Sequence, residues 1–277
     1  MILPAANFHI NKACNAHCDF CFATFREVDG QLPLADALAV IRLLREAGVE
    51  KLNFAGGEPT LHRGIGAMLQ HSRELGFVTS IVTNGARLDA LLDKHATALD
   101  WVGLSVDSGV ESVEVALGRG KGNYVARSIE LADRCRSLGI RVKLNTVVTA
   151  LSCDEDMSAL VQRIAPERWK VFQVLPMAGQ NDGKVEPLLI PPQEFSAFVA
   201  RHRWLDDFGL GPVVEDNDAM RGSYAMIDPL GRCFGNATGT HVYSRPVLEV
   251  GVETAFAEVG VSAAKFEGRG GVYGWSK

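Results

Sequence analysis

The sequence lacks an excess of positive charge. Its 277 residues include 28 lysines and arginines against 33 aspartates and glutamates, which gives a net charge of −5. Proteins that bind nucleic acid polymers or anionic membranes through their overall charge are usually basic. We therefore expect neither of these as a partner, and any basic cluster that matters for function must be local.

Long hydrophobic runs are also missing. No apolar stretch reaches the roughly 20 residues of a membrane-spanning helix. The first residues, MILPAANFHINK, do not have the charged start and apolar core of a signal peptide. There is no internal repeat or low-complexity tract, while 47% of the residues are hydrophobic, enough for a large core. We expect a globular, cytoplasmic protein that works as a monomer.

Cysteine is scarce, yet three of the six cysteines lie within eight residues. Cys14, Cys18 and Cys21 have CxxxCxxC spacing in the stretch CNAHCDFCF. A disulfide uses two cysteines and a closed structural zinc site uses four ligands, so three fit neither. In a reducing compartment we expect thiols or metal ligands. The scattered Cys135, Cys153 and Cys233 are expected to be buried thiols without a metal.

Strand and helix patterns alternate along the first two thirds of the chain. Apolar runs predict strands at 7–10, 51–54, 78–83, 101–105, 141–148 and 170–174. Amphipathic segments predict helices at 34–47, 64–75, 87–92, 123–138 and 154–164. Six strands separated by five helices predict a parallel α/β fold, either a partial (β/α) barrel or an open doubly wound sheet.

The pattern is lost after residue 174. Three prolines interrupt it, a helix is predicted at 193–202, and the last seventy or so residues are rich in glycine. We expect an irregular C-terminal extension there. The acidic run Glu215–Asp218 is expected to be a solvated loop.

Polar motifs directly follow four successive predicted strands. The cysteines follow the first, AGGEPT at 55–60 follows the second, TNG at 83–85 closes the third and LSVDS at 104–108 closes the fourth. Parallel α/β folds build active sites at the carboxyl ends of their strands. Glycines in the second motif let the backbone approach a ligand closely. The sequence therefore predicts one site shared by these four loops.

The CxxxCxxC motif followed by a GGE loop resembles the radical S-adenosylmethionine (SAM) superfamily. The resemblance implies a [4Fe–4S] cluster held at three irons by Cys14, Cys18 and Cys21, with SAM on the fourth iron. It also implies that the amino group of SAM is bound by Gly56, Gly57 and Glu58, and that Asn84, Ser105 and Arg119 contact its ribose and carboxylate. The remaining residues that it assigns to the SAM site are Phe20 and Thr83.

Further segments narrow the resemblance. KLNFAGGEPTL, LGRGKGNYV, VKLNTVV, RWKVFQ, GSYAMID and RGGVYGWSK are similar to viperin and its prokaryotic relatives, from about residue 7 to the C-terminus. This implies a partial (β/α)6 TIM-like barrel at residues 1–206 and an extension at 207–277 that closes over a nucleotide. The implied enzyme removes the 4′ hydrogen of a ribonucleoside triphosphate (CTP, UTP or GTP), and the 3′ hydroxyl leaves as water. The 3′-deoxy-3′,4′-didehydro product terminates viral RNA synthesis, and a flavodoxin or ferredoxin would supply electrons.

The prediction of the substrate-binding residues depends partly on the alternation of side chains along a strand. In the run 141–148, alternation places Arg141, Lys143 and Asn145 on one face, which predicts a polar interior because parallel strands are normally covered on both sides. By the resemblance, cations and amides hold the triphosphate, and Tyr224 and Asn145 lie at the reacting sugar, where Tyr224 donates a proton or hydrogen atom or only packs. The residues assigned to the substrate in this way are Lys51, Asn53, Lys143, Asn145, Arg168, Lys170, Tyr224, Arg269, Gly270 and Gly271.

Other readings stay open at this stage. A radical SAM enzyme for a peptide or cofactor substrate would show further C-terminal cysteines, and a zinc-binding or nucleotide-binding module would be non-catalytic. The loop FGNATGT at 234–240 lacks the basic residues of animal viperins, so the sequence does not identify the base. The amphipathic N-terminal helix of animal viperins is not seen, which favours a soluble enzyme of the prokaryotic type.

Overall fold

A curved sheet of ten strands organises the protein, of which the computed structural model describes residues 2–275. Its parallel centre runs in chain order, as predicted. These six strands are β1 (Ala5–His9), β2 (Lys51–Ala55), β3 (Val78–Thr83), β4 (Trp101–Ser105), β5 (Arg141–Val148) and β6 (Arg168–Gln173). The sheet order β10-β9-β8-β1-β2-β3-β4-β5-β6-β7 leaves two edges, so the partial barrel is confirmed.

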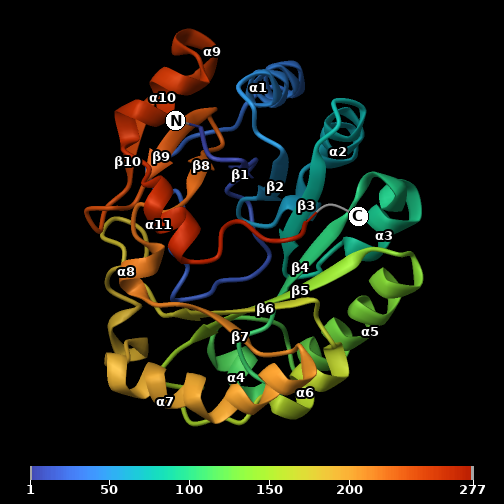
Figure 1. Cartoon of the computed structure of the whole chain (residues 1–277), viewed down its shortest axis with the longest axis vertical. Helices are drawn as coiled ribbons and strands as arrows, with labels where there is room; N and C mark the ends of the chain where they lie inside the picture. The colour runs from blue at the N-terminus through green and yellow to red at the C-terminus, as the bar shows by residue number, and fades with distance from the viewer. Residues whose placement is uncertain (1, 276–277) are drawn as a thin grey trace.

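Helices lie along the outside of the curved sheet (Figure 1). They are α1 (Leu34–Glu46), α2 (Ile65–Glu74), α3 (Leu88–His95), α4 (Glu111–Ala116), α5 (Tyr124–Ser137) and α6 (Ser158–Ile164). Helix α1 buries Ala37, Val40, Ile41 and Leu44, which share one face because they recur at helical spacing. The short α4 was not predicted. Helix α6 begins four residues later than predicted, where Ser158 N–H donates to Asp156 Oδ1 at 2.9 Å.

The C-terminal third is more regular than predicted. Its strands are β7 (Pro212–Glu215), β8 (Ala225–Ile227), β9 (Arg232–Gly235) and β10 (Val242–Pro246), and its helices are α7 (Pro192–His202), α8 (Asn217–Met220), α9 (Val247–Val250), α10 (Val252–Val259) and α11 (Ala263–Gly268). Short 3₁₀ helices lie at Pro59–Leu61, Ala96–Ala98, Glu186–Leu188 and Arg203–Phe208. Strand β7 pairs with β6 and β8 pairs with β1, both in parallel. The extension thus completes both edges of the sheet, and the expectation of an irregular segment was wrong for these strands.

Strand alternation separates the two faces of the sheet as predicted. On β5, Val142 and Leu144 belong to the hydrophobic core between the sheet and the outer helices, whereas Lys143 and Asn145 line the interior of the barrel. After α11, the last described residues cross the open middle of the barrel (Figure 1). Among residues 2–275, no helix is both long and apolar enough to cross a membrane.

The extension shares the core of the barrel. Ile227 of β8 and Val247 of α9 are fully buried in the same apolar cluster as Leu52 of β2. The division at residue 206 stays a prediction about domains, but the two parts are packed through one core. We therefore expect them to unfold together.

Replacing Ile227 with alanine tests this shared core. Because Ile227 is fully buried, Ile227→Ala should lower the free energy of unfolding by about 2–5 kcal/mol. The measurement is urea unfolding followed by both tryptophan fluorescence and circular dichroism. The matched control is Leu248→Ala, which removes as many carbons at a side chain that is 41% exposed and should change stability little. Two separate transitions for the barrel and the extension would contradict the shared core.

Candidate active site

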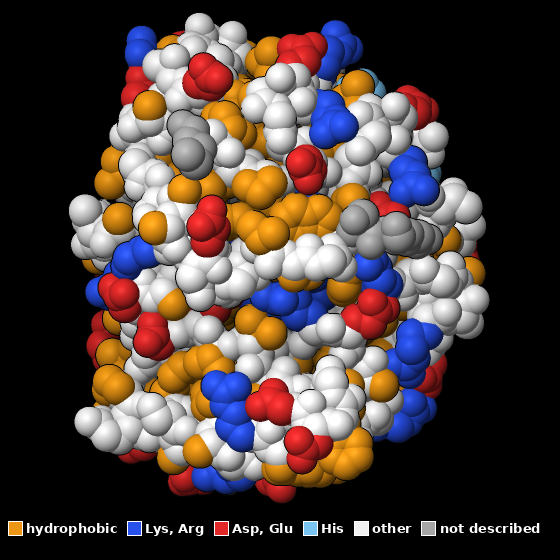
Figure 2. Space-filling view, in the orientation of Figure 1, with side chains coloured by type: hydrophobic (Ala, Val, Ile, Leu, Met, Phe, Trp, Pro, Cys, Tyr) orange, Lys and Arg blue, Asp and Glu red, His pale blue; other side chains and the backbone are white. Residues whose placement is uncertain are grey.

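One cavity of about 340 Å³ lies inside the barrel, and every site residue named from the sequence lines it. The cysteines and GGE loop lie at the carboxyl ends of the strands, and Lys51, Lys143, Arg168 and Lys170 lie deeper along β2, β5 and β6. The volume is within the range of small-molecule sites. Figure 2 shows the face of the molecule that the C-terminal segment crosses. In the middle of this face, Lys and Arg side chains (blue) lie below a strip of hydrophobic side chains (orange). The ligand that each residue binds remains a prediction.

Gly56 and Gly57 hold the cysteine loop against the end of β2, where a Cβ on Gly56 would lie 2.5 Å from Asn11 O. Gly57 N–H donates to Asn11 O at 2.7 Å, and Glu58 N–H donates to Ala13 O at 2.8 Å. A Cβ on Gly57 would lie 2.4 Å from Lys12 O, which is far inside van der Waals contact. From the sequence, a ligand was expected to approach the backbone closely at this motif. The structure assigns it to the backbone that carries the cysteines.

A third glycine holds the same loop from the other side. His17 N–H donates to Gly118 O at 3.1 Å, and a Cβ on Gly118 would lie 2.3 Å from His17 O. Gly118 also has φ +86°, which favours glycine. Sequence reasoning did not select this residue, although it lies in the segment LGRGKGNYV that carried part of the resemblance.

The cysteine loop presents three thiols to one cavity. All six cysteines are free thiols, and Cys14, Cys18 and Cys21 face one cavity. Burial raises the pKa of Cys18 to about 12, and it also raises the pKa of Cys14 and Cys21, so a metal must displace their protons. Within residues 2–275, no three His, Cys, Asp or Glu side chains are placed to hold one metal ion. Three thiols that face one cavity fit an iron–sulfur cluster, which bonds each thiolate through its own iron.

Glu58 ties the ends of β2 and β3 together. Its Oε1 accepts hydrogen bonds from Thr60 N (2.9 Å), Thr60 Oγ1 (2.5 Å) and Thr83 Oγ1 (2.6 Å), and its Oε2 accepts one from Asn84 N (2.8 Å). Glu58 is nearly fully buried. Much of its acceptor capacity is therefore used within the protein, and Oε2 is the oxygen with capacity left for a ligand donor.

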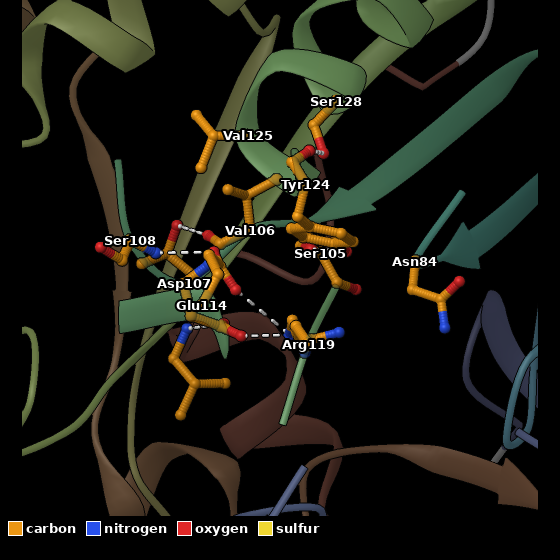
Figure 3. A network of polar contacts seen from close by, with 12 residues as sticks. Asn84, Ser105, Val106, Asp107, Ser108, Glu114, Arg119, Tyr124, Val125 and Ser128 are labelled. Atoms are coloured by element: carbon orange, nitrogen blue, oxygen red, sulfur yellow. Dashed lines mark hydrogen bonds and ion pairs between the residues drawn. The ribbon is translucent and has the colours of Figure 1, made fainter. Parts of the chain in front are cut away.

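Arg119 is held at the cavity wall by two buried carboxylates (Figure 3). Its Nε forms an ion pair with Asp107 Oδ2 and lies 4.0 Å from Glu114 Oε2. Glu114 Oε1 accepts hydrogen bonds from the amides of Asp107 (2.7 Å) and Ser108 (2.9 Å). Burial, reinforced by the charge of Asp107, raises the pKa of Glu114 to about 8.

The carboxylates that hold Arg119 were missed from the sequence. Asp107 lies inside the quoted motif LSVDS, which was the available signal, whereas Glu114 lies on the unpredicted helix α4. Tyr124 supports the same wall by donating to Ser105 O at 2.5 Å. The wall therefore presents a fixed cation beside Ser105 and Asn84, an arrangement that suits a ligand carboxylate and hydroxyls.

Three cations deeper in the cavity have no carboxylate partner among the described residues. Lys51, Lys143 and Arg168 come from β2, β5 and β6, and Lys143 pairs in register with Arg168. They surround the ring of Tyr273, whose centroid is 4.7 Å from Lys51 Nζ, 4.9 Å from Lys143 Nζ and 4.1 Å from Arg168 Cζ. Lys51 Nζ also donates to Tyr273 OH at 2.5 Å. We refer to Lys51, Lys143 and Arg168 as the unpaired cation set.

Crowding and burial disfavour charge on this set. Burial lowers the pKa of Lys51 to about 7, and the charges of Arg141, Arg168 and Lys170 add to the effect. Burial and the charge of Lys51 hold the pKa of Lys143 well below its ordinary value. An anion bound here would restore the charged forms, because opposite charge at short distance favours ionisation.

The other two predicted triphosphate cations surround a buried carboxylate. Lys170 Nζ lies 2.5 Å from Glu215 Oε1, and Arg269 Nη1 lies 3.4 Å from the same oxygen. The exposed fraction of Glu215 is 0%. The expectation of a solvated loop was therefore wrong at Glu215, which ends β7 opposite Phe172 of β6. Burial alone raises the pKa of Glu215, but the charges of Lys170 and Arg269 outweigh it and hold the pKa below its usual value.

The glycines after Arg269 do not form a free anion-binding loop. Gly270 N–H donates to Glu267 O at 2.9 Å, and Gly271 N–H donates to Phe266 O at 2.8 Å, so both amides close the end of α11. Gly270 O accepts a hydrogen bond from Arg168 Nη2 at 2.7 Å. The glycines thus place the tail over the unpaired cation set. Ser276 and Lys277 of the tail motif lie outside the described residues.

Residues 9–164 match the radical SAM superfamily. Two bacterial relatives are named S-adenosylmethionine-dependent nucleotide dehydratase, and each is 40% identical over 99% of this chain. The chain spans 97% of the protein from Flammeovirga pacifica but 59% of the one from Lacinutrix mariniflava. The chain belongs to the radical SAM superfamily, in its nucleotide dehydratase family.

The radical SAM fold also appears in the comparison with solved structures. Streptococcus suis SuiB bound to S-adenosylmethionine has a TM-score of 0.66 and 18% identity, over 83% of this chain and 59% of SuiB. Family members use a [4Fe–4S] cluster and SAM. The three cysteines and the fixed Arg119 therefore lie on a framework suited to these cofactors.

The clamp on the cysteine loop predicts a strong effect of one methyl group. Gly57 does not require a positive φ, so Gly57→Ala should act through its clash with Lys12 O and Ala13 O. We expect a shifted cysteine loop and a large loss of bound iron and sulfide after anaerobic reconstitution. Chemical iron and sulfide assays, with the absorbance near 400 nm, measure the loss. Gly268→Ala, where nothing lies within 4 Å of the added carbon, is the control; normal cluster content in Gly57→Ala would contradict the clamp.

Proposed function

We propose that this protein is a radical SAM dehydratase that converts a ribonucleoside triphosphate to its 3′-deoxy-3′,4′-didehydro analogue. The observation that carries the proposal is the unpaired cation set in the cavity that also contains the cysteine loop. Three basic side chains without a carboxylate partner among the described residues, two of them buried lysines, favour a polyanion, because an uncompensated buried charge is costly. The names of the relatives at 40% identity support a nucleotide as that polyanion.

The cofactors would be held at the carboxyl ends of the strands. We assign Cys14, Cys18 and Cys21 to the cluster, and the GGE loop, Asn84, Ser105 and Arg119 to SAM. Phe20 and Thr83 complete this SAM site. The centroid of the Phe20 ring lies 5.5 Å from Arg119 Cζ. When bound, the cluster and SAM supply a 5′-deoxyadenosyl radical that removes a hydrogen atom from the substrate.

Strand register orders the substrate in the cavity. Ser105, Asn145 and Lys170 form one row across β4, β5 and β6, and Gly103, Lys143 and Arg168 form the row two residues deeper. Two residues along a strand span about 7 Å. We place the ribose at the first row, near Asn145, Asn53 and Tyr224, and the triphosphate at the second row. The sugar then lies between the radical source and the phosphate ligands.

The remaining parts of the proposal concern partners and place of action. The reaction needs one electron to cleave SAM and a second to complete the product, and we propose that a flavodoxin or ferredoxin supplies both. We further propose a cytoplasmic monomer whose segment 207–277 closes over the nucleotide. Because the product lacks a 3′ hydroxyl, it would terminate RNA chains made by a viral polymerase.

An anaerobic assay tests the function directly. The reconstituted protein is given SAM, a reductant and ATP, GTP, CTP or UTP in separate reactions, and products are followed by mass spectrometry. We expect one triphosphate to raise 5′-deoxyadenosine formation and to yield a nucleotide lighter by one water. SAM cleavage without any change in nucleotide mass would retain the radical chemistry but overturn the substrate, and would favour a peptide or cofactor substrate.

Proton uptake provides a second test, independent of turnover. At pH 8, Lys51 with a pKa of about 7 is mostly neutral in the free protein, and bound phosphates favour its charged form. Nucleotide binding should therefore take up protons at pH 8 and weaken as the pH rises above 7. Calorimetric titration of the reconstituted protein in two buffers of different ionisation enthalpy measures the uptake.

Two lysine variants sharpen the titration. Lys51→Met should reduce the uptake, whereas Lys94→Met on the exposed surface of α3 should leave it unchanged. Binding without proton uptake would show that the triphosphate does not lie at the unpaired cation set.

A further inference from the structure

The segment that follows β6 holds residues 20–27, which form the second half of the cysteine loop. Asn181 Nδ2 donates to Phe20 O at 3.0 Å, and the neighbouring Gln180 contacts the turn that comes next. Both side chains are buried. The glycine contacts at the end of β2 and after α4 act on residues 11–18. A different part of the chain therefore holds each half of the loop.

Gln180 binds the turn that follows Cys21. Its Oε1 accepts hydrogen bonds from Phe25 N at 2.7 Å and from Thr24 Oγ1 at 3.0 Å. Thr24 Oγ1 also lies 3.0 Å from Gln180 O. One buried amide side chain thus satisfies both a backbone donor and a hydroxyl of the same turn.

Glu27 fixes the orientation of this amide. Gln180 Nε2 donates to both carboxylate oxygens of Glu27, at 3.0 and 2.9 Å, and Tyr243 OH donates to the same carboxylate. Because the nitrogen of the Gln180 amide faces Glu27, its oxygen must face the amide of Phe25.

The backbone of the turn is strained where Gln180 binds it. Phe25 has φ +51°, a conformation that bulky side chains rarely adopt. Such a conformation persists only where the surroundings enforce it, and strained residues gather at functional sites. Here the hydrogen bond from Phe25 N to Gln180 and the full burial of the Phe25 side chain enforce it.

The same turn provides a hydrogen-bond donor to a cysteine. The amide of Ala23 donates to the thiol of Cys21. In the chain, Ala23 lies between Cys21 and the two residues that Gln180 binds. Hydrogen bonds to ligand sulfurs are among the factors that set the reduction potential of an iron–sulfur cluster. The position of this turn therefore bears on how easily the cluster is reduced.

We propose that Gln180 is a positioning residue that raises the reduction potential of the cluster by holding the Ala23 amide on the sulfur of Cys21. A hydrogen bond to the sulfur stabilises the more negative, reduced cluster. The step concerned is the transfer of one electron from a flavodoxin- or ferredoxin-type reductant to the cluster, which passes from the 2+ to the 1+ state without a proton. The inference needs the cluster but no particular substrate, so it goes beyond the dehydratase function.

The test is Gln180→Leu, which replaces the side chain with one of similar size that has no donor or acceptor. The reconstituted protein is titrated with dithionite and redox mediators, and the reduced cluster is measured by electron paramagnetic resonance and normalised to its iron and sulfide. We expect the ratio of reduced to oxidised cluster at a fixed potential to fall about tenfold, which is a shift of about 59 mV to more negative potential for one electron.

Two further variants separate positioning from general destabilisation. Gln180→Glu combined with Glu27→Gln exchanges the two ends of the contact at unchanged net charge. It retains an acceptor for Phe25 N–H and should restore the wild-type potential. Thr24→Val removes one hydroxyl contact with Gln180 and should shift the potential in the same direction as Gln180→Leu. It decides the matter if Gln180→Leu does not fold.

His202→Leu is the matched control. His202 is also a fully buried side chain that accepts a hydrogen bond from a backbone amide, that of Met157 at 2.9 Å, and it lies on α7 outside the cavity. It should lower stability but leave the potential unchanged.

Three outcomes would overturn the proposal. They are an unchanged potential in Gln180→Leu, a potential that rises because the loop opens to solvent, and a double variant that keeps the shifted potential. Absence of a dehydrated nucleotide in the anaerobic assay would instead overturn the dehydratase function and leave this inference intact.

Discussion

Buried positive charge without a carboxylate partner is the constraint on which the cavity depends. Lys51 and Lys143 are almost fully buried, and Arg168 lies beside them. Removing a charge from water costs free energy. Contacts of the lysines with the aromatic faces of Trp101 and Tyr273 offset only part of this cost. The free protein responds with lowered lysine pKa values. The cavity is therefore poorly satisfied when empty, and in the proposed function the substrate's phosphates supply the missing negative charge.

The two ends of the cavity are fixed by different means. At the cofactor end, Gly57 and Gly118 allow their backbones to contact the backbone of the cysteine loop. The cysteine loop can therefore shift only if the end of β2 or the segment after α4 shifts with it. At the substrate end, the register of β5 and β6 sets the order of polar side chains. The cysteine loop is therefore tied by backbone contacts to the end of β2, whose sheet also contains β5 and β6.

The sequence predicted what depends on local pattern. Periodicity located six parallel strands and the inward Lys143 and Asn145, and cysteine spacing located the cluster loop. It did not predict β7 to β10, because strands of three to five residues carry too little alternation and their pairing depends on distant segments. The expectation of a solvated loop at Glu215 was also wrong. An acidic run in a polar segment is typical of a solvated loop, and only the pairing of β7 with β6 brings Glu215 next to Lys170 and Arg269.

The cations of the cavity form two sets, one that contacts Glu215 and one without a carboxylate partner among the described residues. A site for a triphosphate needs charge that is not already neutralised, which the unpaired cation set provides. If Glu215 faced Lys143 instead, one internal ion pair would weaken phosphate binding and leave Lys170 without its partner. The pairing of β7 with β6 therefore places one buried carboxylate beside Lys170 and leaves Lys51, Lys143 and Arg168 without such a partner among the described residues.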